Sequence, residues 1–242
     1  MSTLRVIHTS DLHTKLDREG AESLALLRQQ SDALLFDSGD AIGATNVTVR
    51  AREPVLDLMN LAGYHAMAVG NREFYLRKRG LLHKTAAAEF AVLSANLKAR
   101  EGELGHLRPW RIFEVGGQRV GVFGITRVMI PPRSWAEVLA DVRFIPWREA
   151  AAQAVAELRD EVDWLLALSH LGTRREMKLA TTHPEIDAIL GGHAHDELDE
   201  RVGPKPTLIS HPGHHGSGAA VIEMTHEPDG STSISRKLVE LR

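Results

Sequence analysis

The sequence contains no cysteine, so this chain of 242 residues forms neither disulfides nor thiolate metal sites. Any metal ion that it binds must therefore be held by nitrogen and oxygen ligands. No apolar run approaches the roughly 18 residues that a membrane helix needs. The first residues also lack the basic and apolar segments of a secretory signal, which predicts an unprocessed, cytoplasmic protein.

An excess of charge of one sign is absent as well. The 29 Lys and Arg residues nearly balance the 32 Asp and Glu residues, and the formal net charge is -3. This balance argues against a dedicated surface for nucleic acid or for anionic membranes, although a metal site can still bind a phosphate. With 43% hydrophobic residues, the chain is expected to form one domain, residues 1–242, with a substantial core. Nothing in this composition indicates an oligomeric state.

Short apolar runs alternate with amphipathic segments along the chain. The runs at 4–9, 33–36, 66–69, 164–168 and 188–190 have the length and character of buried parallel strands. Helices are expected at 21–30, 52–61, 81–90, 148–159 and 173–182. A hairpin at 110–115 and 119–125, and strands at 92–95, 207–210, 219–225 and 233–238, complete the pattern. This order predicts an α/β fold, a four-layer α-β-β-α sandwich of two mixed sheets flanked by helices.

Metal-binding side chains follow each of the five apolar runs. They are, in chain order, Asp11, His13, Asp40, Asn71, His170, His193 and His195. Because the carboxyl ends of parallel strands meet at one edge of a sheet, we expect these side chains to converge there. Asp11 and His13 are two residues apart, which in an extended backbone places both side chains on one face; His193 and His195 repeat this spacing. Imidazole and carboxylate without sulfur suit manganese, iron, zinc or cobalt.

Each of these signals has a simpler explanation when it is taken alone. An Asp-X-His triplet is more often a turn, and a single histidine after an apolar run is more often a hydrogen-bonded core residue. Five such signals at consistent strand ends favour a metal site instead. The same weighing applies to Trp135 and Trp147, which are expected in the core rather than beside a cleft.

The ordered motifs Asp-Leu-His, Gly-Asp, Gly-Asn-X-Glu-Phe, Ser-His-Leu-Gly and Gly-Gly-His-Ala-His resemble those of the calcineurin-like metallophosphoesterases. The resemblance is to the catalytic domain of the 5′-nucleotidase branch and covers nearly the whole chain. It implies hydrolysis of a small phosphorylated substrate, a phosphomonoester or phosphodiester with nucleotides among the candidates, by two-metal activation of water. It also implies two divalent ions of manganese, iron or zinc. The implied ligands are Asp11, His13, Asp40 and His195 for one ion, and Asp40, Asn71, His170 and His193 for the other.

The chain departs from the family pattern beside Asn71. The family has a histidine there that protonates the leaving oxygen and an aspartate that orients it, whereas this chain has Arg72 and Tyr75. Arg72 stays charged, so it can grip a phosphate but is a poor proton donor. Loss of a general acid costs about 10²- to 10⁴-fold in rate. Two readings follow: an enzyme with altered leaving-group chemistry in which Asn71 and Arg72 face the substrate, or a catalytically weak sensor or interaction module that binds metal and a phosphate ligand.

Other side chains are candidates for the missing proton donor. His211, His214 and His215 lie in a loop that the resemblance places near the metal ions, and His214 is the candidate catalytic group among them; a polar surface loop is the alternative. Arg174 and Arg175 are candidate phosphate contacts or solvated helix residues. Many members of the branch carry a C-terminal domain that stacks the nucleoside, and none is expected here, so nucleotide specificity does not transfer.

Overall fold

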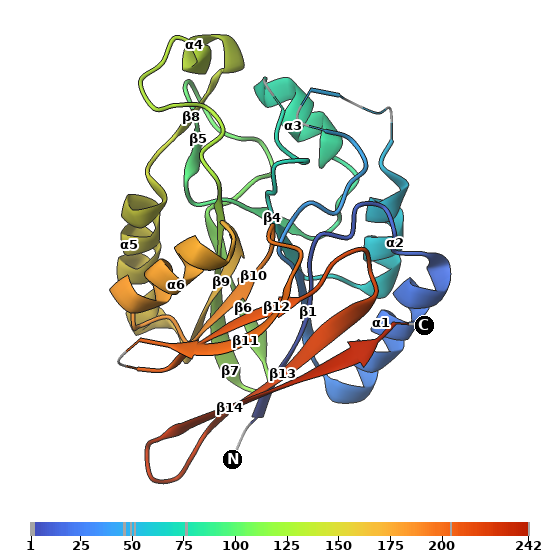
Figure 1. Cartoon of the computed structure of the whole chain (residues 1–242), viewed down its shortest axis with the longest axis vertical. Coiled ribbons are helices and arrows are strands. Elements are labelled where there is room, and N and C mark those ends of the chain that lie inside the picture. The colour runs from blue at the N-terminus through green and yellow to red at the C-terminus, as the bar shows by residue number, and fades with distance from the viewer. Residues whose placement is uncertain are drawn as a thin grey trace.

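The computed structural model describes residues 3–45, 47–48, 50, 52–75, 77–203 and 205–241. Two six-stranded mixed sheets pack face to face, with helices on the outside of each (Figure 1). The first sheet consists, in spatial order, of β14 (Thr232–Glu240), β13 (Gly218–His226), β1 (Thr3–Thr9), β2 (Leu34–Asp37), β3 (Ala66–Ala68) and β4 (Ala91–Leu93). Strands β1 to β4 run parallel, and β13 and β14 are antiparallel to their neighbours.

The second sheet also has a parallel centre with antiparallel edges. It consists, in spatial order, of β11 (Glu197–Val202), β12 (Thr207–Pro212), β10 (Ala188–Gly191), β9 (Trp164–His170), β7 (Gln118–Thr126) and β6 (Trp110–Val115). Strands β12, β10, β9 and β7 are parallel, while β11 and β6 pair antiparallel at the two edges. The predicted hairpin of β6 and β7, with its turn at Gly116 and Gly117, is confirmed.

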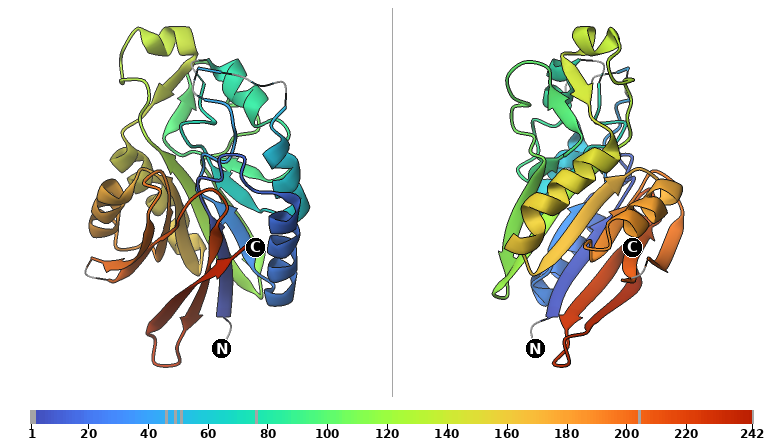
Figure 2. Two further views of the ribbon diagram at one scale, coloured as in Figure 1. Left: turned by 45° about the vertical axis from the view of Figure 1, so that its right-hand side comes forward. Right: turned by 90° about the vertical axis from the view of Figure 1, so that its left-hand side faces the viewer.

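Helices cover the outer face of each sheet (Figure 2). The first sheet is covered by α1 (Arg18–Ser31), α2 (Pro54–Ala62) and α3 (Lys78–Lys84), and the second by α5 (Trp147–Leu158), which continues into η1 (Arg159–Glu161), and α6 (Thr173–Thr182). A small sheet of β5 (Leu97–Ala99) and β8 (Val142–Phe144), with α4 (Ala136–Ala140), caps one end of the molecule. The predicted four-layer α-β-β-α sandwich is therefore confirmed.

The central strands are buried on both faces, which explains their almost continuous apolar sequence. On β9, Leu166 and Leu168 point into the layer between the two sheets, while Leu165 and Ala167 point toward the helices. Successive side chains of a strand alternate in this way, so each central strand contributes to two hydrophobic layers. Among the described residues, no helix combines the length and apolar character required to cross a membrane.

Several elements differ from the sequence prediction. The helix expected at 81–90 is α3, which ends earlier because Thr85 leaves the helical conformation and its hydroxyl donates to the carbonyl of Leu81. Strand β11 was not predicted because its sequence is charged and mostly exposed. Trp135 was expected in the core, and this is wrong: it is 75% exposed at the start of α4. Trp147 packs partly buried against the core under α5, as expected.

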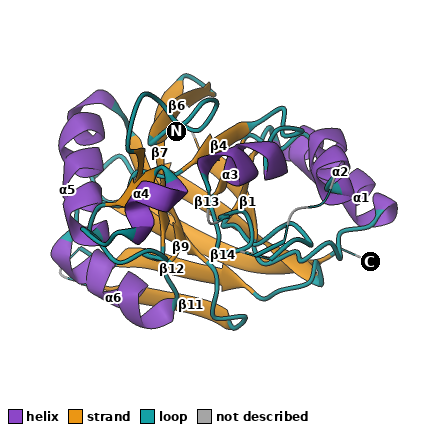
Figure 3. Cartoon of the chain, turned by 90° about the horizontal axis from the view of Figure 1, so that it is seen from above, coloured by secondary structure: helices purple, strands orange, loops and turns teal. Residues whose placement is uncertain are grey.

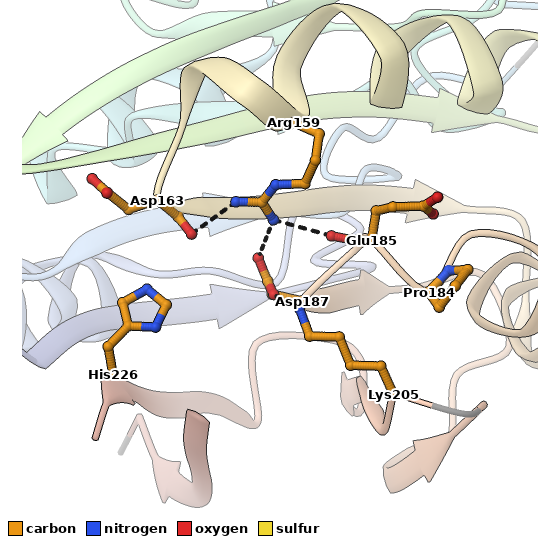
Figure 4. A pocket seen from close by; sticks show the side chains of 7 residues that line it. All are labelled: Arg159, Asp163, Pro184, Glu185, Asp187, Lys205 and His226. Atoms are coloured by element: carbon orange, nitrogen blue, oxygen red, sulfur yellow. Dashed lines mark hydrogen bonds and ion pairs between the residues drawn. The ribbon is translucent and has the colours of Figure 1, made fainter. Parts of the chain in front are cut away.

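The amino ends of β9, β10 and β12 border a cavity of about 620 Å³, at the edge opposite to the predicted ligands (Figure 4). Asp187 lies at its centre and is almost completely buried. Its carboxylate accepts hydrogen bonds from Arg159 at 2.8 Å, Lys205 at 2.7 Å and the amide of Leu165 at 2.8 Å. Arg159 and Lys205 thus neutralise Asp187 and anchor the start of β10, and the predicted metal ligands lie elsewhere.

The layer between the sheets is expected to carry most of the stability. Leu166→Ala should lower the free energy of unfolding by about 2–5 kcal/mol, because Leu166 is fully buried and its loss leaves a cavity. Leu26→Ala is the matched control, since Leu26 is 55% exposed on α1 and its loss should cost less than about 0.5 kcal/mol. Urea denaturation measures both values. Equal losses would contradict this assignment of the core.

Candidate metal centre

The predicted ligands lie at one edge of both sheets, toward which the view of Figure 3 looks. Asp11 follows β1, Asp40 follows β2 and Asn71 follows β3 in the first sheet, while His170 ends β9 and His193 follows β10 in the second sheet. The parallel register brings these strand ends together. The candidate site therefore lies across the boundary between the two sheets, and each sheet supplies part of it.

Five of the predicted ligands converge closely. The His170 Nε2 atom lies 3.4 Å from Asp40 Oδ1, and His13 Nε2 lies 3.6 Å from Asp40 Oδ2. The His195 Nε2 atom lies 3.3 Å from Asp11 Oδ1. Two sets of donor atoms, one from Asp11, His13 and His195 and one from Asp11, Asp40 and His170, each lie within 4.8 Å of one another. The geometry is that of side chains gathered around one or more small cations.

Several of these donor atoms have no other partner. Within the described part of the chain, Asp11 Oδ1, His13 Nε2, Asn71 Oδ1 and His170 Nε2 are buried and make no hydrogen bond. The His170 Nδ1 atom donates to the Ser38 carbonyl at 2.8 Å, so Nε2 is the ring nitrogen without a hydrogen-bond partner. Asn71 donates its amide nitrogen to Asp40 at 3.0 Å, which leaves its oxygen free. Because buried polar atoms are normally paired, these four atoms fit the ligand shell of a divalent cation.

The charges of the site favour a cation as well. Burial opposes ionisation of Asp40, but His170 and His13 outweigh it and hold the pKa of Asp40 well below its usual range. Burial likewise opposes protonation of His170, yet the Asp40 carboxylate raises the pKa of His170 to about 9. In the metal-free protein the His170 ring is therefore in its positively charged, doubly protonated form at neutral pH. A cation that binds here would replace one of these protons.

His193 and Asn71 are placed less simply. The His193 ring lies beside the His170 ring, with centroids 5.1 Å apart, but its Nε2 atom contacts Arg127 Nη1. Burial and the neighbouring charges of His170 and Arg127 lower the pKa of His193 to about 4. His193 thus has the neutral imidazole that a metal requires, although it belongs to neither donor set. Its role as a ligand stays a prediction, as does that of Asn71.

The backbone is not extended at five of the predicted ligands. The expectation that residues two apart share one face of an extended backbone, as for Asp11 and His13, is therefore wrong. Asp11, His13, Asp40, His193 and His195 all have positive φ, between 47° and 74°. This left-handed conformation costs of the order of 1–3 kcal/mol for each residue that is not glycine. Asp11 and His13 still converge, with His13 Nε2 3.8 Å from Asp11 Oδ1, because the backbone turns sharply after the strand end. Such strain is concentrated at functional sites, where the surrounding structure compensates for it.

Glu73 supplies part of that compensation. Its fully buried carboxylate accepts hydrogen bonds from the amides of Asp40 at 2.9 Å, Ala41 at 2.9 Å and Gly70 at 2.8 Å. It thereby joins the loop after β2 to the loop after β3. Burial and the nearby Asp40 carboxylate raise the pKa of Glu73. The sequence analysis assigned no role to Glu73, although an acidic residue inside the Gly-Asn-Arg-Glu-Phe motif was a signal.

His211 joins the segments that carry His170 and His195. Its Nε2 lies 2.5 Å from Glu176 and its Nδ1 lies 2.5 Å from Asp196, which follows His195 directly. Glu176 also accepts a hydrogen bond from Ser169 at 2.8 Å. Burial works against protonation, but the bonds to Glu176 and Asp196 raise the pKa of His211. His211 is therefore a structural link between ligand segments, and the suggestion that it donates a proton to substrate is wrong.

His214 and His215 border the site, as expected. The His214 ring stacks on the ring of His195, with centroids 4.8 Å apart, and the His214 Nδ1 lies 3.1 Å from the His195 carbonyl. The Nε2 atom of His215 lies 3.3 Å from Nδ1 of His13. Because a carbonyl only accepts, Nδ1 of His214 carries the hydrogen and its Nε2 is left for other partners.

Arg72 faces the candidate site. Its amide donates to Asp40 Oδ1 at 2.7 Å, its Nε lies 3.8 Å from Asp40 Oδ2, and its side chain is 30% exposed. Arg72 is therefore held beside Asp40 and is not fully solvated. Tyr75, in contrast, packs against Gly80 and beneath Lys84, whose Nζ lies 5.2 Å from the ring centroid.

The role of Glu73 leads to a stability test. Glu73→Gln should lower the free energy of unfolding by about 1–3 kcal/mol, because an amide NH₂ cannot accept the backbone N–H groups that one carboxylate oxygen now accepts. Glu89→Gln is the matched control, since Glu89 is exposed. Urea denaturation of both variants measures the difference. If the two variants were equally stable, Glu73 would not be the support that its contacts indicate.

Comparison with known proteins gives the family. The model of the calcineurin-like phosphoesterase family matches residues 4–197. A 5′-nucleotidase of Rattus norvegicus is 30% identical over 223 residues, which cover 81% of this chain and 38% of the rat protein. The trifunctional nucleotide phosphoesterase protein YfkN of Bacillus subtilis is 26% identical over 269 residues, which cover 94% of this chain and 18% of that protein.

Solved structures agree with this result. A 5′-nucleotidase precursor from Thermus thermophilus superposes with a TM-score of 0.82 and 27% sequence identity, and the match covers 99% of this chain and 54% of that chain. The chain thus spans about half of the Thermus protein and less than half of the rat protein. The family match, the layered fold and the clustered imidazole and carboxylate side chains are consistent with one another. The chain belongs to the calcineurin-like phosphoesterase family.

Proposed function

We propose that this chain is a metal-dependent phosphoesterase that hydrolyses phosphomonoesters or phosphodiesters, with nucleotides among its substrates. The observation that carries the proposal is the convergence of imidazole and carboxylate donors whose buried atoms have no partner among the described residues. The nucleotide part rests on relatives that are named 5′-nucleotidase. We further propose that the chain forms one catalytic domain, within which the whole reaction takes place.

The proposed ligands divide into two sets that share Asp40. Two divalent transition-metal ions, when bound, supply activation of water and neutralisation of charge on the phosphoryl oxygens. The residues proposed for one ion are Asp11, His13, Asp40 and His195, and those for the other are Asp40, Asn71, His170 and His193. Manganese, iron and zinc all suit this mixture of nitrogen and oxygen donors.

Arg72 and Asn71 are proposed to face the phosphoryl group. The Arg72 guanidinium lies beside the Asp40 carboxylate, so it can bind phosphoryl oxygens next to the ligands. In the reaction, water adds to phosphorus, the bond from phosphorus to the leaving oxygen breaks, and that oxygen either takes a proton or departs as an anion. Arg72 does not give up a proton at ordinary pH. The chemistry therefore favours leaving groups that are stable as anions.

His214 is the proposed contact on the leaving-group side. Its position on the His195 ring brings it to the rim of the site, and its Nε2 atom is not used by the contact with the His195 carbonyl. An imidazole there can donate a hydrogen bond to the leaving oxygen. This contact would come from a different loop than the acid that the family motif places beside Asn71.

A second candidate function follows from the same replacement. The family's histidine and aspartate are both absent at Arg72 and Tyr75, and the Tyr75 ring is used in packing. A chain that binds metal and phosphate without turnover, as a sensor or interaction module, would show this combination. The retained ligand set favours the enzyme, because binding of phosphate alone does not require every donor.

Metal content and activity test the proposal together. Protein loaded with manganese or zinc should contain close to two ions per chain and should hydrolyse an aryl phosphate. Asp40→Ala should weaken metal binding more than about 100-fold and abolish measurable turnover, because Asp40 is the proposed shared ligand. Elemental analysis and product release provide the two measurements.

Asp229→Ala is the control for this experiment, since Asp229 lies in an exposed turn and accepts hydrogen bonds from Ser231. It should keep the full metal content. A stoichiometry near zero, or metal binding that is indifferent to Asp40→Ala, would overturn the metal assignment. Full metal content without turnover on any phosphate ester would favour the sensor.

Arg72 has its own test. Arg72→Ala should weaken inhibition by inorganic phosphate by about tenfold or more, because one charge-assisted contact is lost, while the metal content stays the same. Arg79→Ala is the matched control, since Arg79 is exposed on α3 and follows no predicted ligand. Inhibition constants and elemental analysis separate the effects. An unchanged phosphate affinity in Arg72→Ala would place this side chain outside the substrate site.

A further inference from the structure

A second arginine reaches the candidate site from a strand that carries no predicted ligand. Arg127 directly follows Thr126, the last residue of β7, which pairs with His170 on β9. The buried side chain of Asn96 holds this strand end, because it donates to the Thr126 carbonyl at 2.8 Å and accepts from the Thr126 amide at 2.9 Å. Arg127 therefore starts from the same edge as the ligands, on a fixed backbone.

The guanidinium of Arg127 lies among the ligand loops. Its Nη1 atom contacts Nε2 of His193, and the side chain is partly buried. Arg175 approaches the same loops from α6, with its Nη1 atom 3.4 Å from the carbonyl of Leu171, the residue after His170. Burial and the positive charge of Arg175 both lower the pKa of Arg127.

Neither cation is neutralised by the protein. Across the described residues, no carboxylate forms an ion pair with Arg127 or Arg175. A guanidinium has five N–H donors, and a partly buried one is costly when these donors have no acceptor. Arg127 contacts Nε2 of His193, and this atom would no longer be available to Arg127 if His193 binds a metal. An anion beside the two arginines would satisfy both.

Arg127 and Arg72 contact different members of the ligand cluster. Arg72 Nε is 3.8 Å from Asp40, and Asp40 is 3.4 Å from His170. The His170 ring lies beside the His193 ring, with centroids 5.1 Å apart, and His193 in turn contacts Arg127. A phosphoryl group bound beside Arg72 and Asp40 therefore leaves Arg127 available for another anionic group.

Building on the proposed function, we propose that Arg127 and Arg175 form an anion subsite that binds a second phosphate group of the substrate, on its leaving-group side. The preferred substrates are then those in which the phosphorus under attack is linked to a group that carries another phosphate, as in a diphosphate. Such a leaving group departs as a phosphate anion, so it does not need the acid that Arg72 has replaced. The subsite and the absent acid thus point to the same class of substrate.

Kinetics with AMP and ADP test the subsite, because the two differ only in the second phosphate. In manganese-loaded protein, Arg127→Met should lower the ratio of kcat/KM for ADP to that for AMP about 10- to 100-fold, as expected for loss of a charge-assisted contact. Arg127→Lys should give a smaller loss, because a point charge replaces the planar fork. Lys178→Met is the control, since Lys178 is another exposed cation on α6 and its ammonium group contacts none of the described ligand residues; its ratio should not change.

Calorimetry gives a reading that does not depend on turnover. Arg127→Met should weaken binding of methylenediphosphonate about 10- to 100-fold relative to binding of methylphosphonate, with metal content checked by elemental analysis before and after. Thermal denaturation shows whether each variant is folded, and Arg127→Lys serves if Arg127→Met is not. Equal losses for both ligands would assign Arg127 to the transferred phosphoryl group, and no loss would place it in solvent; either result overturns the subsite.

The outcomes separate the subsite from the proposed function. A wild-type protein that hydrolyses AMP and ADP, with an unchanged ratio in Arg127→Met, leaves the enzyme standing and removes the subsite. A wild-type protein that hydrolyses no phosphate ester removes the enzyme. In that case the calorimetric comparison of the two phosphonates still decides whether Arg127 binds a second anionic group.

Discussion

The site depends on two sheets whose parallel strands end at one common edge. Neither sheet holds all of the proposed ligands, because Asp11, Asp40 and Asn71 come from the first, and His170 and His193 from the second. The apolar layer between the sheets fixes their relative position, and so it also fixes the distances between donor atoms. Burial of apolar surface in this layer therefore holds together polar groups whose clustering is unfavourable by itself. These groups repel one another and lose contact with water.

The ligand loops are strained, and buried polar contacts hold the strain in place. Asp11, Asp40 and His195 adopt a left-handed backbone that side chains with a Cβ atom disfavour. The Glu73 carboxylate ties two of the loops of the first sheet, and His211 ties two segments of the second. These two supports act on the backbone and on residues next to the ligands, so neither needs to touch a metal ion in order to influence its binding.

The layered fold and the cluster of donors could be predicted from the sequence, because strand burial and ligand chemistry both leave local patterns. The apolar run before His170 identifies a buried strand, and its polar end identifies the edge. Arg127 escaped because arginine is not a metal ligand, although it follows an apolar run in the same way. Glu73 and His211 escaped for another reason: their partners are distant in sequence, so only the folded chain reveals what they join. Trp135 was wrongly expected in the core, because the identity of a tryptophan does not show whether the segment that carries it packs against the core or lies exposed.

Strand β10 is anchored at both of its ends, and this limits how the molecule can deform. Before the strand, Asp187 is held by Arg159 and Lys205. Beyond it, the amide of His193 donates to Asp11 at 2.8 Å, a bond that crosses from one sheet to the other. Sliding of one sheet over the other would break this bond and separate the donors together. Shear between the two layers is thus coupled directly to assembly of the site, and occupation of the site would stiffen the whole sandwich against it.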